Sequence, residues 1–103
     1  MYNFGKNIKY LINNNKNMTI VAASDILGIN VIKLRSIINS DQYPNKYLLL
    51  DICNFLGLSY EWAVIKIVEE MGYIYMSSTL YSYFSKENAE NMKKNMYFSL
   101  KFE

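Results

Sequence analysis

Hydrogen-bonding and charged side chains recur along residues 30–39, a segment whose apolar residues have helical spacing. A helix that turns Leu34, Ile37 and Ile38 inward, at about 100° per residue, turns the side chains between them outward. The outward and flanking residues are Val31, Ile32, Lys33, Arg35, Ser36 and Asn39. A guanidinium can pair with guanine or phosphate, an amide with adenine or phosphate, and a hydroxyl with either. The chemistry of this face is therefore recognition by hydrogen bonds and charge.

Val31 and Ile32 open the segment with side chains that form no hydrogen bonds. They can pack on thymine methyl groups, or they can be buried against another protein. The sequence leaves both interpretations open.

Other chemistry has few candidate residues. The chain has no His and a single cysteine, Cys53, so neither a disulfide framework nor a zinc site is expected. There is no Cys/His pair and no glycine-rich phosphate loop, and the carboxylates are scattered rather than paired. We therefore expect a protein that is not an enzyme and that needs no metal or other cofactor.

Two short helices joined by a turn must hold the 30–39 segment in place. Thr19 is suited to cap a helix that ends at Leu27, Gly28 can take the positive φ of a turn, and Asn30 can cap the next helix. A helix pair of this kind needs a small residue where the helices touch, and Ser24 stands four residues before Gly28. The apolar positions that lock the pair together are Ala23, Leu27, Ile29, Leu34 and Ile37.

Three further helices are predicted around this pair. The spacing of Phe4, Ile8 and Leu11 predicts a helix over residues 4–13. Pro44 and Asn45 start a helix that Gly57 ends, with an apolar face that includes Tyr47. Ser59 caps a fifth helix that ends near Gly72.

The residue composition of the chain changes after Gly72. Two aromatic runs around a short polar link predict a β-hairpin over residues 73–84, followed by a helix over 85–95. Strict alternation of apolar and polar residues predicts a terminal strand over 96–102. The fold class expected is thus mainly α, a domain over 1–72 with a small β/α extension over 73–103.

The charges are unevenly distributed along the chain. Residues 1–46 carry six basic and two acidic side chains, a net charge of +4, whereas residues 47–103 have a net charge of −2. The positive half contains the helix pair, as attraction to phosphate requires. We expect Thr19, Asn30, Lys33 and Lys46 to contact phosphates. No apolar stretch is long enough to cross a bilayer or to form a signal peptide, so a cytoplasmic protein is expected.

Residues 4–66 together resemble the Cro/repressor-like (xenobiotic-response-element) helix-turn-helix family. The resemblance rests on Phe4-Gly5, on Ile8-Lys9-Tyr10-Leu11, on Met18-Thr19, on the run from Pro44 to Leu56-Gly57-Leu58-Ser59 and on Tyr60-Glu61-Trp62. It implies a five-helix domain that places its third helix in the major groove of DNA. Ile20 departs from the family, which often has a phosphate-binding Gln at this position. Ile12 and Ile38 stand where many members bury an Arg–Glu pair, and a joint apolar replacement is tolerated in a core.

The function expected is that of a repressor-like transcriptional regulator that binds double-stranded DNA as a homodimer. The tail is the expected dimer element, through pairing of terminal strands that contain Tyr97, Phe98, Leu100 and Phe102. The tail can instead simply cover its own core. The alternative function is a protein-interaction module, such as a phage- or plasmid-type inhibitor or antirepressor, that uses Val31 and Ile32 to contact a protein partner.

Overall fold

Short helices account for most of the structure. The computed structural model describes the backbone of residues 3–102 and the side chains of residues 3–96. The elements are α1 (Phe4–Tyr10), a π-helical turn η1 (Leu11–Asn15), α2 (Ile20–Leu27), α3 (Val31–Ile38), α4 (Lys46–Leu56), α5 (Tyr60–Met71), a 3-10 turn η2 (Tyr73–Tyr75), α6 (Met76–Tyr83) and α7 (Lys86–Phe102). The five helices predicted for residues 4–72 are present, and the mainly α character is confirmed.

Capping side chains fix where these helices begin. The side-chain oxygens of Thr19, Asn30, Asn45 and Ser59 each accept a hydrogen bond from a backbone N–H in the first turn of α2, α3, α4 and α5 respectively. Each bond satisfies a donor that the helix itself leaves without a partner, which typically stabilises a helix by ~1 kcal/mol. A residue distant in the sequence also contacts the N-terminus of α1, since the backbone N–H of Phe4 donates to the Glu70 carboxylate at 3.1 Å.

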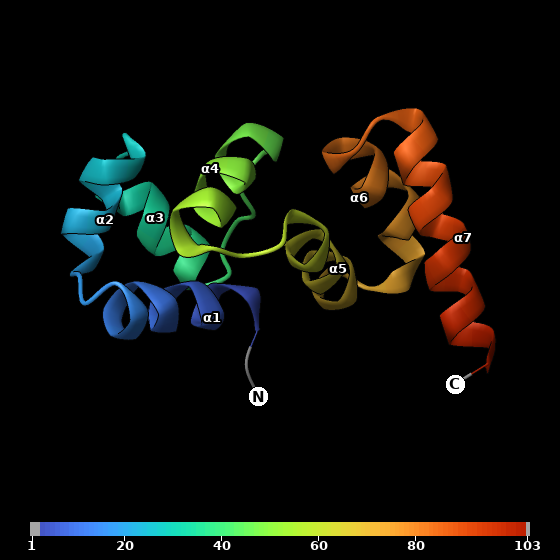
Figure 1. Cartoon of the computed structure of the whole chain (residues 1–103), viewed down its shortest axis with the longest axis horizontal. Coiled ribbons are helices and arrows are strands. Elements are labelled where there is room, and N and C mark those ends of the chain that lie inside the picture. The colour runs from blue at the N-terminus through green and yellow to red at the C-terminus, as the bar shows by residue number, and fades with distance from the viewer. Residues whose placement is uncertain (1–2, 103) are drawn as a thin grey trace.

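The helices are arranged along a long axis, as Figure 1 shows. α2 and α3 lie at one end, α6 and α7 lie at the other, and α5 lies between the two groups. The principal extents are 41 × 27 × 23 Å. One hydrophobic cluster runs through the molecule, from Phe4 and Ile8 in α1, through Leu34 in α3, to Leu80 in α6.

A close approach between α1 and α3 organises the N-terminal part. A Cβ atom on Gly5 would lie 2.3 Å from the Ile38 carbonyl oxygen and 2.7 Å from that of Ile37. Only glycine permits this contact without a shift of one helix. Ile12 and Ile38, the residues that the resemblance sets at the positions of an Arg–Glu pair, are both buried in the core.

The predicted hairpin over 73–84 is wrong, because residues 73–83 form η2 and α6. Met76, Leu80 and Tyr83 are buried, at the i, i+4 and i+7 spacing of a helix face. Ser78, which belongs to the polar link expected as a turn, donates through its Oγ to the Tyr75 carbonyl, and Ser82 Oγ donates to the Ser78 carbonyl within the helix. Burial against α5 therefore outweighs the β-propensity of the aromatic residues.

The predicted terminal strand is also wrong, because residues 96–102 continue α7. Ala89, Met92 and Met96 repeat at helical spacing and pack in or against the core, so the helix is already established before the alternating run begins. No strand occurs between residues 3 and 102 with which such a run could pair. The terminal strands on which the expected dimer contact depended are therefore not formed.

Two tyrosines attach the tail to the rest of the fold. The Tyr60 hydroxyl in α5 donates to the Tyr83 carbonyl at 2.6 Å, and its ring meets that of Phe84 edge to face. The Tyr83 hydroxyl in turn donates to the Pro44 carbonyl at 2.6 Å. The tail thus covers α5 and the segment before α4. Within the part of the chain described, no helix is both long and apolar enough to span a membrane.

Candidate nucleic-acid interface

The turn between α2 and α3 is built by a small set of backbone bonds. Gly28 ends α2 with φ 68° and ψ 31°, the left-handed conformation that glycine adopts most easily. The Ile29 N–H bonds to the Ser24 carbonyl at 3.0 Å, which closes the end of α2 in a Schellman motif. Ser24 is buried, and its hydroxyl donates to Val21 O at 2.7 Å. The small, turn and cap residues therefore act in the positions predicted for them.

α3 has one buried face and one exposed face. Leu34, Ile37 and Ile38 are buried, as their spacing predicts. On the other side the structure exposes Ile32, Lys33, Arg35 and Asn39 and leaves Val31 and Ser36 half-buried. All six residues predicted on the outer face of α3 are thus brought together on one accessible surface. We call this set of six the α3 outer face.

Within residues 3–96, the two cations of the α3 outer face have no ion-pair partner. Among residues 3–96 the one ion pair joins Lys66 to Glu69, far from α3 in the sequence, and neither Lys33 nor Arg35 forms an ion pair. The first turns of α2, α3 and α4 also contain no acidic residue. No carboxylate within the first turn therefore neutralises the positive end of any of these three helix dipoles, which favours an anion at each end.

The capping residues Thr19 and Asn30 each use a side-chain oxygen to accept a backbone hydrogen bond. Asn30 Oδ1 accepts from the Ile32 N–H at 2.7 Å, and Thr19 Oγ1 accepts from the Ala22 N–H at 3.1 Å. Both residues are exposed. The Asn30 amide N–H groups and the Thr19 hydroxyl proton remain as donors, which is the half of their chemistry that a phosphate oxygen needs.

Lys46 lies at the first turn of α4, next to a residue whose exposure the sequence pattern did not predict. The sequence pattern predicts Tyr47 on the apolar face of this helix, but the residue is 70% exposed, and the Lys46 ammonium lies 5.1 Å from the centre of its ring. The buried residues Leu48, Leu49 and Ile52 define a helix face that excludes position 47, and this spacing was the available signal. Tyr47 joins Lys46 as a candidate contact residue.

The predicted dimer residues cannot be placed in the same way. Tyr97, Phe98, Leu100 and Phe102 belong to the backbone of α7, but their side chains lie outside the described residues.

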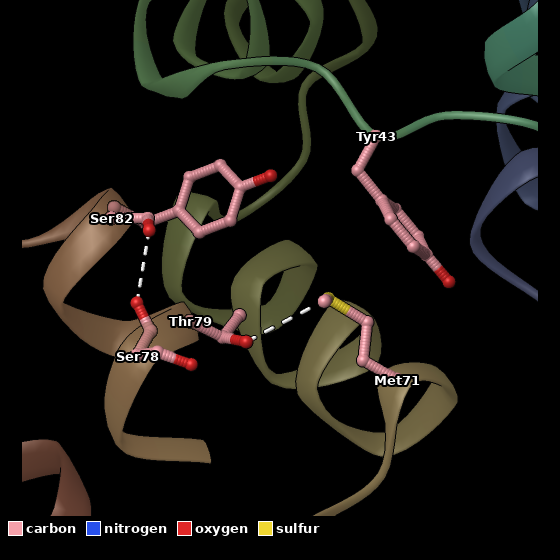
Figure 2. Close-up of a pocket in the computed structure, with 6 residues that line it drawn as sticks. Tyr43, Met71, Ser78, Thr79 and Ser82 are labelled. Atoms are coloured by element: carbon pink, nitrogen blue, oxygen red, sulfur yellow. Dashed lines mark hydrogen bonds between the residues drawn. The ribbon is translucent and has the colours of Figure 1, made fainter. Parts of the chain in front are cut away.

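A depression of about 190 Å³ lies between α5, α6 and the segment before α4 (Figure 2). Its lining residues are Tyr43, Met71, Ser78, Thr79, Ser82 and Tyr83. None of them is charged at neutral pH, and the hydroxyls of the serines, Thr79 and Tyr83 are bonded to the protein itself. The groups that line this depression provide no acid–base pair or activated nucleophile.

The buried thiol and the side chains of metal-binding types form no further site among the described residues. Cys53 is buried, and burial raises the pKa of its thiol to about 11, which opposes formation of a reactive thiolate. Among the described residues, no three side chains of the metal-binding types gather at one point.

Comparison of the chain with protein-family models, with curated proteins and with solved structures finds no match.

Proposed function

We propose that this chain is a sequence-specific, double-stranded DNA-binding transcriptional regulator of the Cro/repressor-like type, with α3 in the major groove of each half-site. The observation that carries the proposal is the α3 outer face. There Lys33 and Arg35 are exposed and form no ion pair with any described side chain, on a helix that the turn at Gly28 joins to α2. An α-helix fits the major groove, and its cations are attracted by the phosphates on both sides.

The contact residues have separable roles. We assign base contacts to Arg35, which is exposed, and to Ser36, which is half-buried, and a base or phosphate contact to the exposed Asn39 at the end of α3. We assign contacts with the DNA backbone to Lys33, Thr19, Asn30 and Lys46, which are all exposed and supply hydrogen-bond donors or positive charge. The role requires no catalysis, metal or cofactor. It belongs in the cytoplasm, where a free thiol such as that of Cys53 stays reduced.

We propose further that the active species is a homodimer on an inverted repeat. A single module of this size contacts few bases, and a second linked contact raises the affinity without new chemistry. The two copies of α3 would then read half-sites about 34–36 Å apart, one turn of DNA. Since residues 96–102 are helical, the two copies must meet through helices rather than through paired strands.

A second candidate function is favoured by one observation. Ile32 is 70% exposed within the proposed reading surface. Exposed aliphatic side chains are typical of surfaces that bind another protein. In this case the same fold would be a phage- or plasmid-type inhibitor or antirepressor that binds its partner through Val31 and Ile32.

Binding to double-stranded DNA distinguishes the two functions. Fluorescence anisotropy of a labelled random-sequence duplex, titrated with the full chain at several salt concentrations, measures the phosphate contribution directly. For the regulator we expect log K to fall linearly with log salt, by roughly 0.9 for each phosphate neutralised. Absence of binding at the lowest salt would favour the protein-interaction module.

A further inference from the structure

The first turn of α3 presents aliphatic carbon to solvent at the point where the proposed function needs a reading surface. Ile32 is 70% exposed, although the helix buries the neighbouring Leu34 completely. The backbone N–H of Ile32 is taken by Asn30 Oδ1. Ile32 can therefore contact a partner only through its methyl and methylene groups. The half-buried Val31 beside it adds further aliphatic surface.

An aliphatic side chain can distinguish base pairs in one way only. In the major groove, guanine, adenine and unmodified cytosine present hydrogen-bond donors and acceptors, whereas thymine also presents a methyl group at C5. Packing Ile32 on a polar base edge would remove water from groups that then lack a partner, which is unfavourable. Packing it on the methyl group removes only apolar surface from water.

We propose that Ile32, supported by Val31, reads a pyrimidine C5-methyl group, so that each half-site places one beneath the first turn of α3. The inference rests on the proposed function. Arg35 and Ser36 lie three and four residues further on, on the same face of the helix, so the methyl contact adjoins the hydrogen-bonding contacts. The partner is thus a half-site in which a methyl-bearing base stands beside the bases read by Arg35 and Ser36.

The same methyl group occurs on thymine and on 5-methylcytosine. The two bases differ in the group next to it, since thymine presents a carbonyl acceptor and cytosine an amino donor. We commit to thymine as the base in the unmodified site, and methylated cytosine serves as a separate arm of the test.

The experiment starts from duplexes that the full chain enriches from a random double-stranded library at low salt. Each thymine of an enriched half-site is then replaced singly by deoxyuridine, which removes the methyl group and leaves every hydrogen-bonding group in place. We expect one replacement per half-site to weaken binding roughly four-fold, equivalent to about 0.8 kcal/mol, the contribution of one buried carbon group. A duplex with 5-methylcytosine at that position should bind the protein more tightly than a duplex with cytosine there.

Two variants test whether Ile32 is the residue that contacts the methyl group. Ile32→Ala should bind the thymine and deoxyuridine duplexes equally. Ile26→Ala, which trims the same residue type at a 57% exposed position on α2, should keep the four-fold difference. Equal binding of all thymine and deoxyuridine duplexes by the parent protein overturns the inference and leaves the proposed function standing. So does a difference that survives in Ile32→Ala. Failure to enrich any duplex overturns both.

Discussion

The hydroxyl of Tyr83 donates a hydrogen bond of 2.6 Å to the carbonyl of Pro44, 39 residues earlier in the chain. The bond is buried, and it joins the last turn of α6 to the segment between α3 and α4. Pro44 precedes the cap of α4, the helix that begins with Lys46. This hydrogen bond therefore links the tail to the segment that leads into α4.

Replacement of Tyr83 by phenylalanine removes this bond and leaves the Pro44 carbonyl buried without its partner. We expect Tyr83→Phe to lower the free energy of unfolding by about 1–3 kcal/mol, the usual cost of an unsatisfied buried group. Urea denaturation followed by circular dichroism measures the change. Tyr47→Phe, which removes a hydroxyl from a 70% exposed ring, is the matched control and should change the value by less than ~0.5 kcal/mol. Equal effects of the two substitutions would contradict the role given to Tyr83.

Because the Tyr83 hydroxyl is buried, the free energy of unfolding should depend on pH in the alkaline range. Burial, with the neighbouring Tyr60 and Tyr43, raises the pKa of the Tyr83 phenol to about 12. A phenol in the unfolded chain has a pKa near 10. Because the folded pKa is the higher one, the contribution is complete below about pH 10 and is lost as the pH rises toward 12. We expect the stability difference between the parent protein and Tyr83→Phe to be constant from about pH 7 to pH 9 and to shrink above about pH 10. A constant difference up to about pH 11 would contradict this origin.

Gly5 should be the least replaceable glycine of the fold. Gly5→Ala places a Cβ atom 2.3 Å from the Ile38 carbonyl oxygen, so α1 and α3 must separate, and we expect a loss of about 3 kcal/mol or more. Gly28→Ala meets nothing within 4 Å and retains only the strain of its positive φ, for which we expect about 1–2 kcal/mol. Thermal unfolding of the two variants compares them. If Gly28→Ala were the more destabilised, the close packing of α1 on α3 would be wrong.

Cys53 should not react with thiol reagents while the chain is folded. Its side chain is buried in the core, and burial raises the pKa of the thiol to about 11. We expect the rate of reaction with an aromatic disulfide reagent to be at least about a hundred-fold lower in buffer than in denaturant, because reaction must wait for opening of the core. The absorbance of the released thiolate follows the reaction. Rapid reaction in buffer would show that the packing around α4 is looser than described.

The first five helices could be predicted because their end signals are local. Thr19, Asn30 and Ser59 are short polar residues that bond to a backbone N–H two or three positions away, and Gly28 and Gly57 take a positive φ where a helix stops. Such signals do not depend on what packs against the helix. The outer face of α3 followed from the spacing of its buried residues in the same way.

The tail could not be predicted from local signals, because its structure depends on α5. Tyr81 and Tyr83 favour a strand by intrinsic preference, but Tyr83 reaches the Pro44 carbonyl and Leu80 enters the core only if residues 76–83 are helical. The run from Met96 alternates like a strand, yet it continues a helix that Ala89 has already anchored. Gly5 shows the same limit, since its role is defined by carbonyls more than thirty residues away.

The central claim is that the α3 outer face binds the DNA backbone and bases, and the salt dependence of binding tests it most directly. The double variant Lys33→Ala with Arg35→Ala is compared with Lys86→Ala with Lys94→Ala. Each pair removes two positive charges, and the control pair lies on α7. We expect the α3 variant to weaken duplex binding at least ten-fold and to reduce the slope of log K against log salt by about one to two. The α7 variant should keep the slope of the parent protein. Equal slopes for the parent protein and both variants, or no salt-dependent binding by the parent protein, would contradict the claim.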